Sequence, residues 1–203
     1  MNTTIKTIVF DFGGVLIDWN QRYLYRTVFT DENEMEWFLH NVCTEKWNSL
    51  QDEGIPFSET IPLLQKDFPE YKEQIEMYRS RWVEMVGGEI SESVKILREI
   101  QEKDYPVYGL TNWGSETFRI VFEQFEFLRR LKGIVVSGDE KVVKPNPRLF
   151  DILVKRYAIK PESCIFIDDN INNIQSAKEM GFKTIHFVSP ENLRNDLQVL
   201  NIL

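Results

Sequence analysis

Several side chains that could do chemistry stand at the ends of short apolar runs. Asp11 follows TIVF, the pair Asp168-Asp169 follows CIFI, and Thr111-Asn112 follow a third run, PVYGL. Such runs read as buried strands, and in an open parallel sheet ligands bind beyond the carboxyl ends of the strands. Three carboxylates, a hydroxyl and an amide are therefore expected to meet at one edge of a sheet.

The segment KVVKPNP adds a cationic candidate to that edge. It offers Lys141 and Lys144, and the Lys-Pro context favours Lys144. Three converging carboxylates repel one another strongly at low dielectric, and one lysine is too little to balance them. A divalent metal ion is the natural supplement. Hard carboxylate oxygens with no His or Cys nearby suit Mg²⁺, so the sequence predicts a Mg²⁺ site.

The elements that must position these residues alternate between two patterns. From the second strand onward, β-branched or aromatic runs alternate with segments of helical apolar spacing, and Gly181 suits the end of the last of these helices. This alternation predicts a doubly wound α/β core, a parallel sheet with helices on both faces. The predicted strands are 7–10, 106–110, 133–137, 164–167 and 183–188, and the helices are 91–103, 115–127, 147–157 and 171–180.

The alternation of strands and helices is interrupted after the first strand. About 70 residues follow without a convincing strand, and their aromatic, helical character predicts a second small domain. We expect this domain to be 18–87, inserted into a core formed by 1–17 and 88–203, with hinges at the two Gly-Gly pairs, 13–14 and 87–88. Its expected helices are 21–29, 32–42, 58–68 and 69–86.

Composition narrows the classes of partner. The 203 residues carry a net charge of −8, which argues against a nucleic-acid or anionic membrane surface but not against a small anionic ligand. Cys43 and Cys164 lie far apart in apolar surroundings, so reduced buried thiols are expected. The N-terminal residues lack a signal-peptide pattern and no apolar run has membrane-spanning length, so a cytoplasmic protein is expected. The sequence leaves the oligomeric state open.

Four motifs carry a family resemblance. DFGGVL, LTNW, VKP and IDDN, in this order, resemble the motifs of the haloacid dehalogenase (HAD) superfamily, with a Rossmann-like core. The insertion after the first motif resembles the subclass with a helical C1-type cap. The Asp-x-Gly-x-Val form of the first motif and the EGIPFSE turn are similar to sugar-1-phosphate phosphatases, including glucose-1-phosphate phosphatase. The resemblance implies a Mg²⁺-dependent phosphatase that hydrolyses a small phosphorylated metabolite, with a sugar phosphate such as a sugar 1-phosphate expected.

The resemblance also implies catalytic roles for individual residues. Asp11 is the expected nucleophile, attacking phosphorus to form an aspartyl-phosphate. Thr111 is expected to donate a hydrogen bond to the phosphoryl group, with Asn112 close by, and Lys144 to neutralise nucleophile and phosphate together. Trp113, after the second motif, suits either a substrate-contacting pocket wall or core packing.

The same resemblance implies a set of metal ligands. Mg²⁺ is expected on Asp11, the backbone carbonyl of Gly13, and Asp169, with Asp168 as a direct or water-mediated ligand. Asn173 matches a position, often acidic in the family, that supports the metal site.

Gly13 departs from the family pattern. Most phosphatases of the family carry a second Asp there, which protonates the leaving oxygen and then activates water. Loss of a general acid typically lowers the rate by about 10²–10⁴. Three explanations are open: another acid such as Asp18 or Glu45 replaces it, the substrate has a good leaving group, or activity is lost.

Two further functions compete with the phosphatase. In a 2-haloacid dehalogenase the nucleophile attacks carbon without a metal, and the second acid is absent, so Gly13 fits. The Asp168-Asp169 pair does not, because two metal-free acids beside the nucleophile would oppose a carboxylate substrate. A catalytically inactive relative that binds a phosphorylated ligand is the other alternative. We favour a phosphatase acting on a leaving group less basic than a simple alkoxide.

Overall fold

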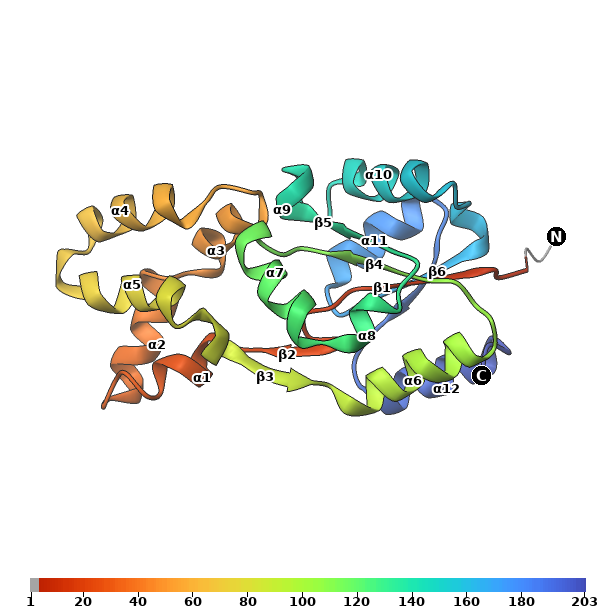
Figure 1. The fold of residues 1–203 in the computed structure, drawn as a ribbon, viewed down its shortest axis with the longest axis horizontal. Helices are drawn as coiled ribbons and strands as arrows, with labels where there is room; N and C mark the ends of the chain where they lie inside the picture. Colours follow the sequence, from red (N-terminus) through yellow and green to blue (C-terminus); the bar gives the residue numbers. More distant parts are fainter. Residues whose placement is uncertain (1–3) are drawn as a thin grey trace.

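The computed structural model describes residues 4–203, and its centre is a five-stranded parallel sheet (Figure 1). The strand order is β5-β4-β1-β6-β7, so the chain starts in the middle and winds outward in both directions. This is the predicted doubly wound α/β core. The strands are β1 (Thr7–Phe10), β4 (Val107–Thr111), β5 (Gly133–Val136), β6 (Cys164–Asp168) and β7 (Lys183–His186).

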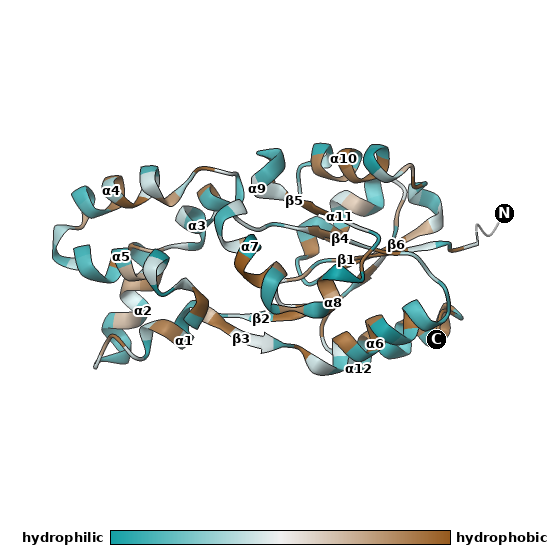
Figure 2. Cartoon of the chain, in the orientation of Figure 1, coloured by the Kyte–Doolittle hydropathy of each residue, from teal (hydrophilic) through white to brown (hydrophobic). Residues whose placement is uncertain are grey.

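Helices cover both faces of the sheet because its strands are apolar on both sides. In β1, Val9 packs into one buried cluster with Phe150 and Phe166, whereas Ile8 and Phe10 join a second cluster on the opposite face. Figure 2 shows brown, apolar strands between helices whose outer sides are teal. One face carries α10 (Pro147–Tyr157) and α11 (Ile171–Glu179); the other carries α6 (Ser91–Glu102) and α12 (Pro190–Val199).

A helical segment lies between β1 and β4 and extends away from the sheet (Figure 1). Its interior is aromatic: the rings of Tyr25 and Phe38 lie 4.9 Å apart, and Trp47 meets Tyr78 edge-on at 4.9 Å. Its helices are α1 (Gln21–Tyr25), α2 (Glu32–Asn41), α3 (Glu45–Asp52), α4 (Phe57–Asp67) and α5 (Lys72–Ser80), with 3₁₀ turns η1 (Pro69–Tyr71) and η2 (Trp82–Met85).

The prediction of a strand-free insertion was wrong. A two-stranded antiparallel ribbon, β2 (Ile17–Trp19) and β3 (Val86–Glu89), connects the sheet to the helices. β2 is three residues long and β3 contains Gly87-Gly88, so neither has a β-branched run and the pairing depends on tertiary contacts. The glycine pair expected to be a hinge therefore lies inside a paired strand.

Several predicted helices have different bounds. The expected helix 69–86 is divided into η1, α5 and η2, and the helix expected over 21–29 ends at Tyr25. The predicted helix 115–127 is split into α7 (Ser115–Gln124) and α8 (Glu126–Arg129). Neither α3 nor the short α9 (Ser137–Glu140) after β5 was predicted.

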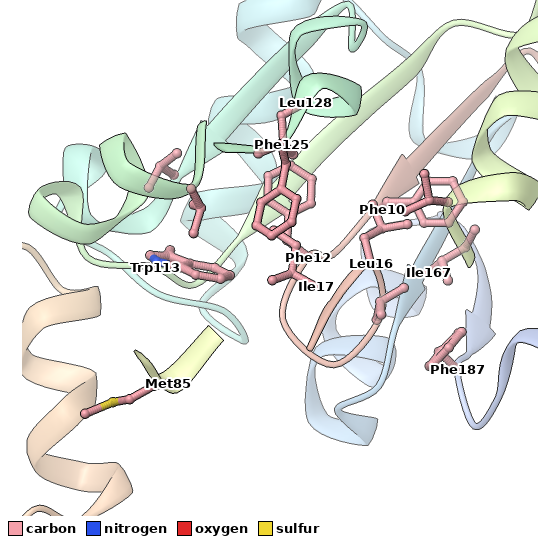
Figure 3. Close-up of a cluster of buried hydrophobic side chains, with 14 of the residues drawn as sticks. Phe10, Phe12, Leu16, Ile17, Met85, Trp113, Phe125, Leu128, Ile167 and Phe187 are labelled. Carbon is pink, nitrogen blue, oxygen red and sulfur yellow. The ribbon is translucent and has the colours of Figure 1, made fainter. Parts of the chain in front are cut away.

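A continuous cluster of buried side chains joins the insertion to the sheet. The cluster, part of which is drawn in Figure 3, includes Phe12 and Trp113 of the core and Met85 at the end of η2. The ring of Trp82 meets that of Trp113 edge-on at 5.9 Å. Aromatic contacts of this kind stabilise by about 0.5–1.5 kcal/mol beyond the area they bury, so the helices are anchored on the core.

Two further expectations concern thiols and membranes. Cys43 and Cys164 are buried free thiols, as predicted. Within residues 4–203, none of the helices combines the length and the apolarity that crossing a bilayer requires.

Candidate active site

Three aspartates meet at the carboxyl edge of the sheet. One oxygen from each of Asp11, Asp168 and Asp169 lies within 4.8 Å of the others. The register explains this, because β1 and β6 are neighbours with Phe10 opposite Ile167, and the Asp11 amide donates to the Ile167 carbonyl at 2.9 Å. The structure thus brings together the carboxylates that the sequence placed at the strand ends.

Lys144 lies between two of these carboxylates. Its Nζ is 2.8 Å from Asp11 Oδ1 and 2.7 Å from Asp168 Oδ2, and it donates to the Leu110 carbonyl at 2.9 Å. Burial alone lowers the pKa of the Lys144 ammonium, but Asp11 and Asp168 outweigh it and the net pKa is raised. The rival Lys141 is exposed at the end of α9. Lys144 is therefore the charged lysine of the cluster.

Asn112 holds the lysine segment in place. Its Oδ1 accepts from the Lys144 amide at 2.7 Å and its Nδ2 donates to the Lys144 carbonyl at 2.9 Å. From the sequence, Asn112 was expected to lie close to the phosphoryl group of the substrate. The structure shows a side chain that also fixes the backbone from which the Lys144 side chain projects.

Protein donors occupy both oxygens of Asp168. Oδ1 accepts from the Asn170 amide at 2.8 Å and from Asn173 Nδ2 at 3.0 Å, and Oδ2 accepts from Lys144. Asp169 has a different environment, since its carboxylate lies over the turn after β1. A Cβ at Gly14, whose φ is +73°, would be 2.6 Å from Asp169 Oδ2. Glycine at this position thus permits the close approach of Asp169.

The charges of the cluster are not balanced by protein groups alone. Burial raises the pKa of Asp11 to about 7, although Lys144 opposes the shift. Burial and the neighbouring Asp168 also raise the pKa of Asp169. A cation at this position would relieve the repulsion, and an all-oxygen donor set fits Mg²⁺.

Thr111 supplies an unused hydroxyl beside these charges. It ends β4, which pairs with β1, and its Oγ1 is buried without a hydrogen-bond partner among the described residues. A buried hydroxyl left unpaired costs about 1–3 kcal/mol, so a ligand that accepts its proton would gain that contact. This environment suits the phosphoryl contact that the resemblance implies.

A small pocket of about 110 Å³ opens beside the cluster, between the sheet edge and the helical insertion. Trp113 forms one wall and also packs on Trp82, so its two proposed roles are compatible. The other lining residues are Gly13, Trp19, Asn48, Gln51, Asp52, Phe57, Trp82, Asn112 and Thr117. Indole rings and amides in one small cavity suit a compact polar ligand.

The pocket contains space at the position of the missing acid. A Cβ on Gly13 would meet only Trp113 Cζ3 within 4 Å, at 3.8 Å. The two suggested replacements do not line this pocket: Asp18 accepts from the Tyr23 hydroxyl at 2.7 Å, and Glu45 is exposed at the start of α3.

Asp52, at the other end of α3, does line the pocket, and sequence reasoning did not single it out. The available signals were Thr44, which caps α3 through Trp47, and Gly54 just past its end. They predict a short helix with Asp52 in its last turn.

The comparisons with known proteins agree with this geometry. Residues 5–181 match a family model described as haloacid dehalogenase-like hydrolase. The chain belongs to the haloacid dehalogenase-like hydrolases. It is 35% identical over 208 residues to a D-ribitol-5-phosphate phosphatase from Bacteroides thetaiotaomicron, covering 97% of this chain and 98% of the relative.

Two other similar proteins are more distant. A phosphorylated carbohydrates phosphatase from Thermotoga maritima is 25% identical over 200 residues, 91% of this chain and 85% of the relative. A HAD family enzyme from Bacteroides thetaiotaomicron, solved with magnesium and inorganic phosphate, has a TM-score of 0.65 and 23% identity, covering 89% of this chain and 93% of that chain. The second likeness shows the shared fold.

Proposed function

We propose that this hydrolase is a Mg²⁺-dependent phosphatase that acts on a small phosphorylated sugar or polyol through an aspartyl-phosphate on Asp11. The observation that carries the proposal is the buried Lys144 ammonium, bonded to Asp11 and Asp168 beside Asp169. Such a cluster can receive a phosphate dianion only if a further cation is present. The names of the two relatives support a phosphorylated carbohydrate or polyol as the substrate.

In the proposed mechanism Asp11 attacks phosphorus, and the bond from phosphorus to the leaving oxygen breaks. Lys144 holds the Asp11 carboxylate by its 2.8 Å contact and neutralises the phosphoryl oxygens. The Thr111 hydroxyl donates a hydrogen bond to one of these oxygens. Water then hydrolyses the aspartyl-phosphate and restores Asp11.

We propose a single Mg²⁺ site whose ligands are Asp11, Asp169 and the Gly13 carbonyl. Asp168 suits a water-mediated contact, because both of its oxygens already accept hydrogen bonds. When bound, the ion supplies positive charge to the phosphoryl oxygens. The magnesium and phosphate in the structural neighbour support this choice of ion.

We also propose that residues 18–87 form a cap over a core of 1–17 and 88–203. The pocket is walled by both parts, with Asn48, Trp82 and Phe57 from the helical segment. A cap in this position would exclude bulk water and select the substrate. A sugar 1-phosphate remains a prediction within the broader substrate class.

The test is a panel of sugar and polyol phosphates assayed for phosphate release with Mg²⁺ and with a chelator. Asp11→Asn is expected to lower turnover by at least about 10³-fold, since the nucleophile is lost. Asp196→Asn, a matched change on the exposed face of α12, should leave it unchanged. Activity that survives chelation, or survives Asp11→Asn, would contradict the proposal. A 2-haloacid dehalogenase would instead hydrolyse a haloacid, and that activity would survive chelation.

A further inference from the structure

A carboxyl group of the helical segment faces the same pocket as Gly13. Asp52 is the last residue of α3, is partly buried, and lines the pocket together with Gly13 and Asn112. Its Oδ2 accepts a long hydrogen bond from Asn48 Nδ2 at 3.3 Å. The pocket therefore contains a carboxyl group although the first motif contributes only Gly13 to its lining.

The backbone of Asp52 is tied to the core. Ser137 Oγ donates to the Asp52 carbonyl at 2.6 Å and accepts from the Trp113 amide at 2.9 Å. Two residues on, Gly54 has a φ of +87°, and a Cβ there would lie 2.4 Å from the Gly138 carbonyl. The end of α3 thus rests directly on the segment after β5, and Figure 1 shows α3 beside α9. These contacts fix Asp52 relative to the loop that follows β4.

The environment of Asp52 suits a group that both holds and releases a proton. Burial raises the pKa of Asp52 to about 7, opposed by a hydrogen bond from the Gly114 backbone and by Lys144, while Glu53 adds to the rise. The Tyr78 hydroxyl also interacts electrostatically with this carboxyl. A pKa near the operating pH is the best compromise for general acid–base catalysis.

We propose that Asp52 is the general acid and base of this enzyme, in place of the side chain absent at Gly13. The inference rests on the proposed phosphatase function. As Asp11 bonds to phosphorus, the Asp52 carboxyl gives its proton to the departing oxygen, so that an alcohol leaves and Asp52 becomes a carboxylate. Asp52 then takes a proton from the water whose oxygen attacks the aspartyl-phosphate. Inorganic phosphate forms, and Asp11 is released as a carboxylate.

This assignment also changes the expectation for the substrate. Gly13 suggested a leaving group less basic than a simple alkoxide. With Asp52 supplying the proton, phosphate esters of ordinary alcohols are substrates as well. Such an ester is what the relative named as a D-ribitol-5-phosphate phosphatase hydrolyses.

The test compares an alkyl with an aryl ester, D-ribitol 5-phosphate and 4-nitrophenyl phosphate. Asp52→Asn is expected to lower kcat/KM for the alkyl ester by about 10²–10⁴, because an alkoxide needs protonation. The aryl ester should lose less than about tenfold, since nitrophenolate leaves without help. Asp52→Glu should restore part of the alkyl activity, and the matched change Asp67→Asn, at the exposed end of α4, should leave the activity on both esters unchanged.

The pH profile provides a readout that a structural role would not change. With the alkyl ester, kcat/KM of the native enzyme should fall as the pH rises above about 7, because Asp52 loses its proton. That fall should be absent for the aryl ester and in Asp52→Asn. Equal losses on both esters, or an unchanged profile in Asp52→Asn, would overturn the assignment. If the native enzyme hydrolyses neither ester, or Asp11→Asn still does, the proposed function fails instead.

Discussion

The pocket side of Gly13 has space for the carboxylate that most phosphatases of the family carry there. The nearest atom to a Cβ at this position is Trp113 Cζ3, at an ordinary contact distance of 3.8 Å. Gly13 is also not among the glycines with a positive φ, so an Asp introduces no backbone strain. Substitution at this residue therefore tests chemistry more than folding.

Gly13→Asp is expected to raise turnover of alkyl phosphates more than of aryl phosphates, because only the former needs a proton donor. The gain should be larger when Asp52→Asn is already present, reaching about 10²-fold or more, since the new acid then replaces a lost one. Steady-state kinetics of the single and double variants with both esters measure this. The same factor on both ester classes would count against leaving-group protonation at this side of the pocket.

Individual site residues differ in how far the sequence reveals them. Asp11 and Asp168-Asp169 were predictable because each ends a strand, and parallel strands bring their ends to one edge. The two bonds of Asn112 to the Lys144 backbone were not, because they join loops 32 residues apart that no local pattern relates. The sequence therefore predicts where the charged side chains lie, but not the hydrogen bonds that orient them.

Among the elements, those that carry their own apolar pattern were predicted and those that depend on a partner were not. α10 begins and ends where the sequence indicated. α3 buries only Trp47 and Gln51, so its eight residues contain little helical periodicity. β2 and β3 are short and form a two-stranded sheet with each other, apart from the central sheet. Asp52 belongs to α3, so it could not be identified as a site residue once α3 itself was not predicted.

The contact between α3 and the core can be weakened without touching the pocket. Ser137→Ala removes the hydroxyl that bridges the Asp52 carbonyl and the Trp113 amide. We expect a loss of about 1–3 kcal/mol in the free energy of unfolding, because a buried N–H is left unpaired. We also expect a smaller version of the Asp52→Asn effect, with alkyl esters losing more than aryl esters.

Urea unfolding and the two-ester assay measure both parts of this prediction. Ser49→Ala is the matched control, since its hydroxyl bonds only within α3, to the Lys46 carbonyl. A stability loss that leaves the alkyl-to-aryl ratio unchanged would show that the bridge does not position Asp52.

In the whole molecule, the sheet and the helical segment are joined in two ways. They contribute side chains to one buried cluster, and both line the same pocket. One buried cluster runs from Phe10 of β1 to Phe38 of α2. The sequence predicted the two parts and their order along the chain. It could not predict their contact, which depends on how Trp82 and Trp113 meet across 31 positions in the sequence. Asp11, Asp168 and Asp169 come together only where β1 and β6 pair, so ion binding and folding are expected to be coupled.

Mg²⁺ is expected to stabilise the whole protein, because the proposed site beside the clustered aspartates exists in the native state but not in the unfolded chain. At 100 times the dissociation constant the gain is about 2.7 kcal/mol. The measurement is the unfolding midpoint in MgCl₂ against NaCl of equal ionic strength. Asp169→Asn should unfold at or above the native midpoint without Mg²⁺, since one repelling charge is gone, and should lose most of the Mg²⁺ shift. A shift of equal size in Asp169→Asn would place the stabilising ion elsewhere on the molecule.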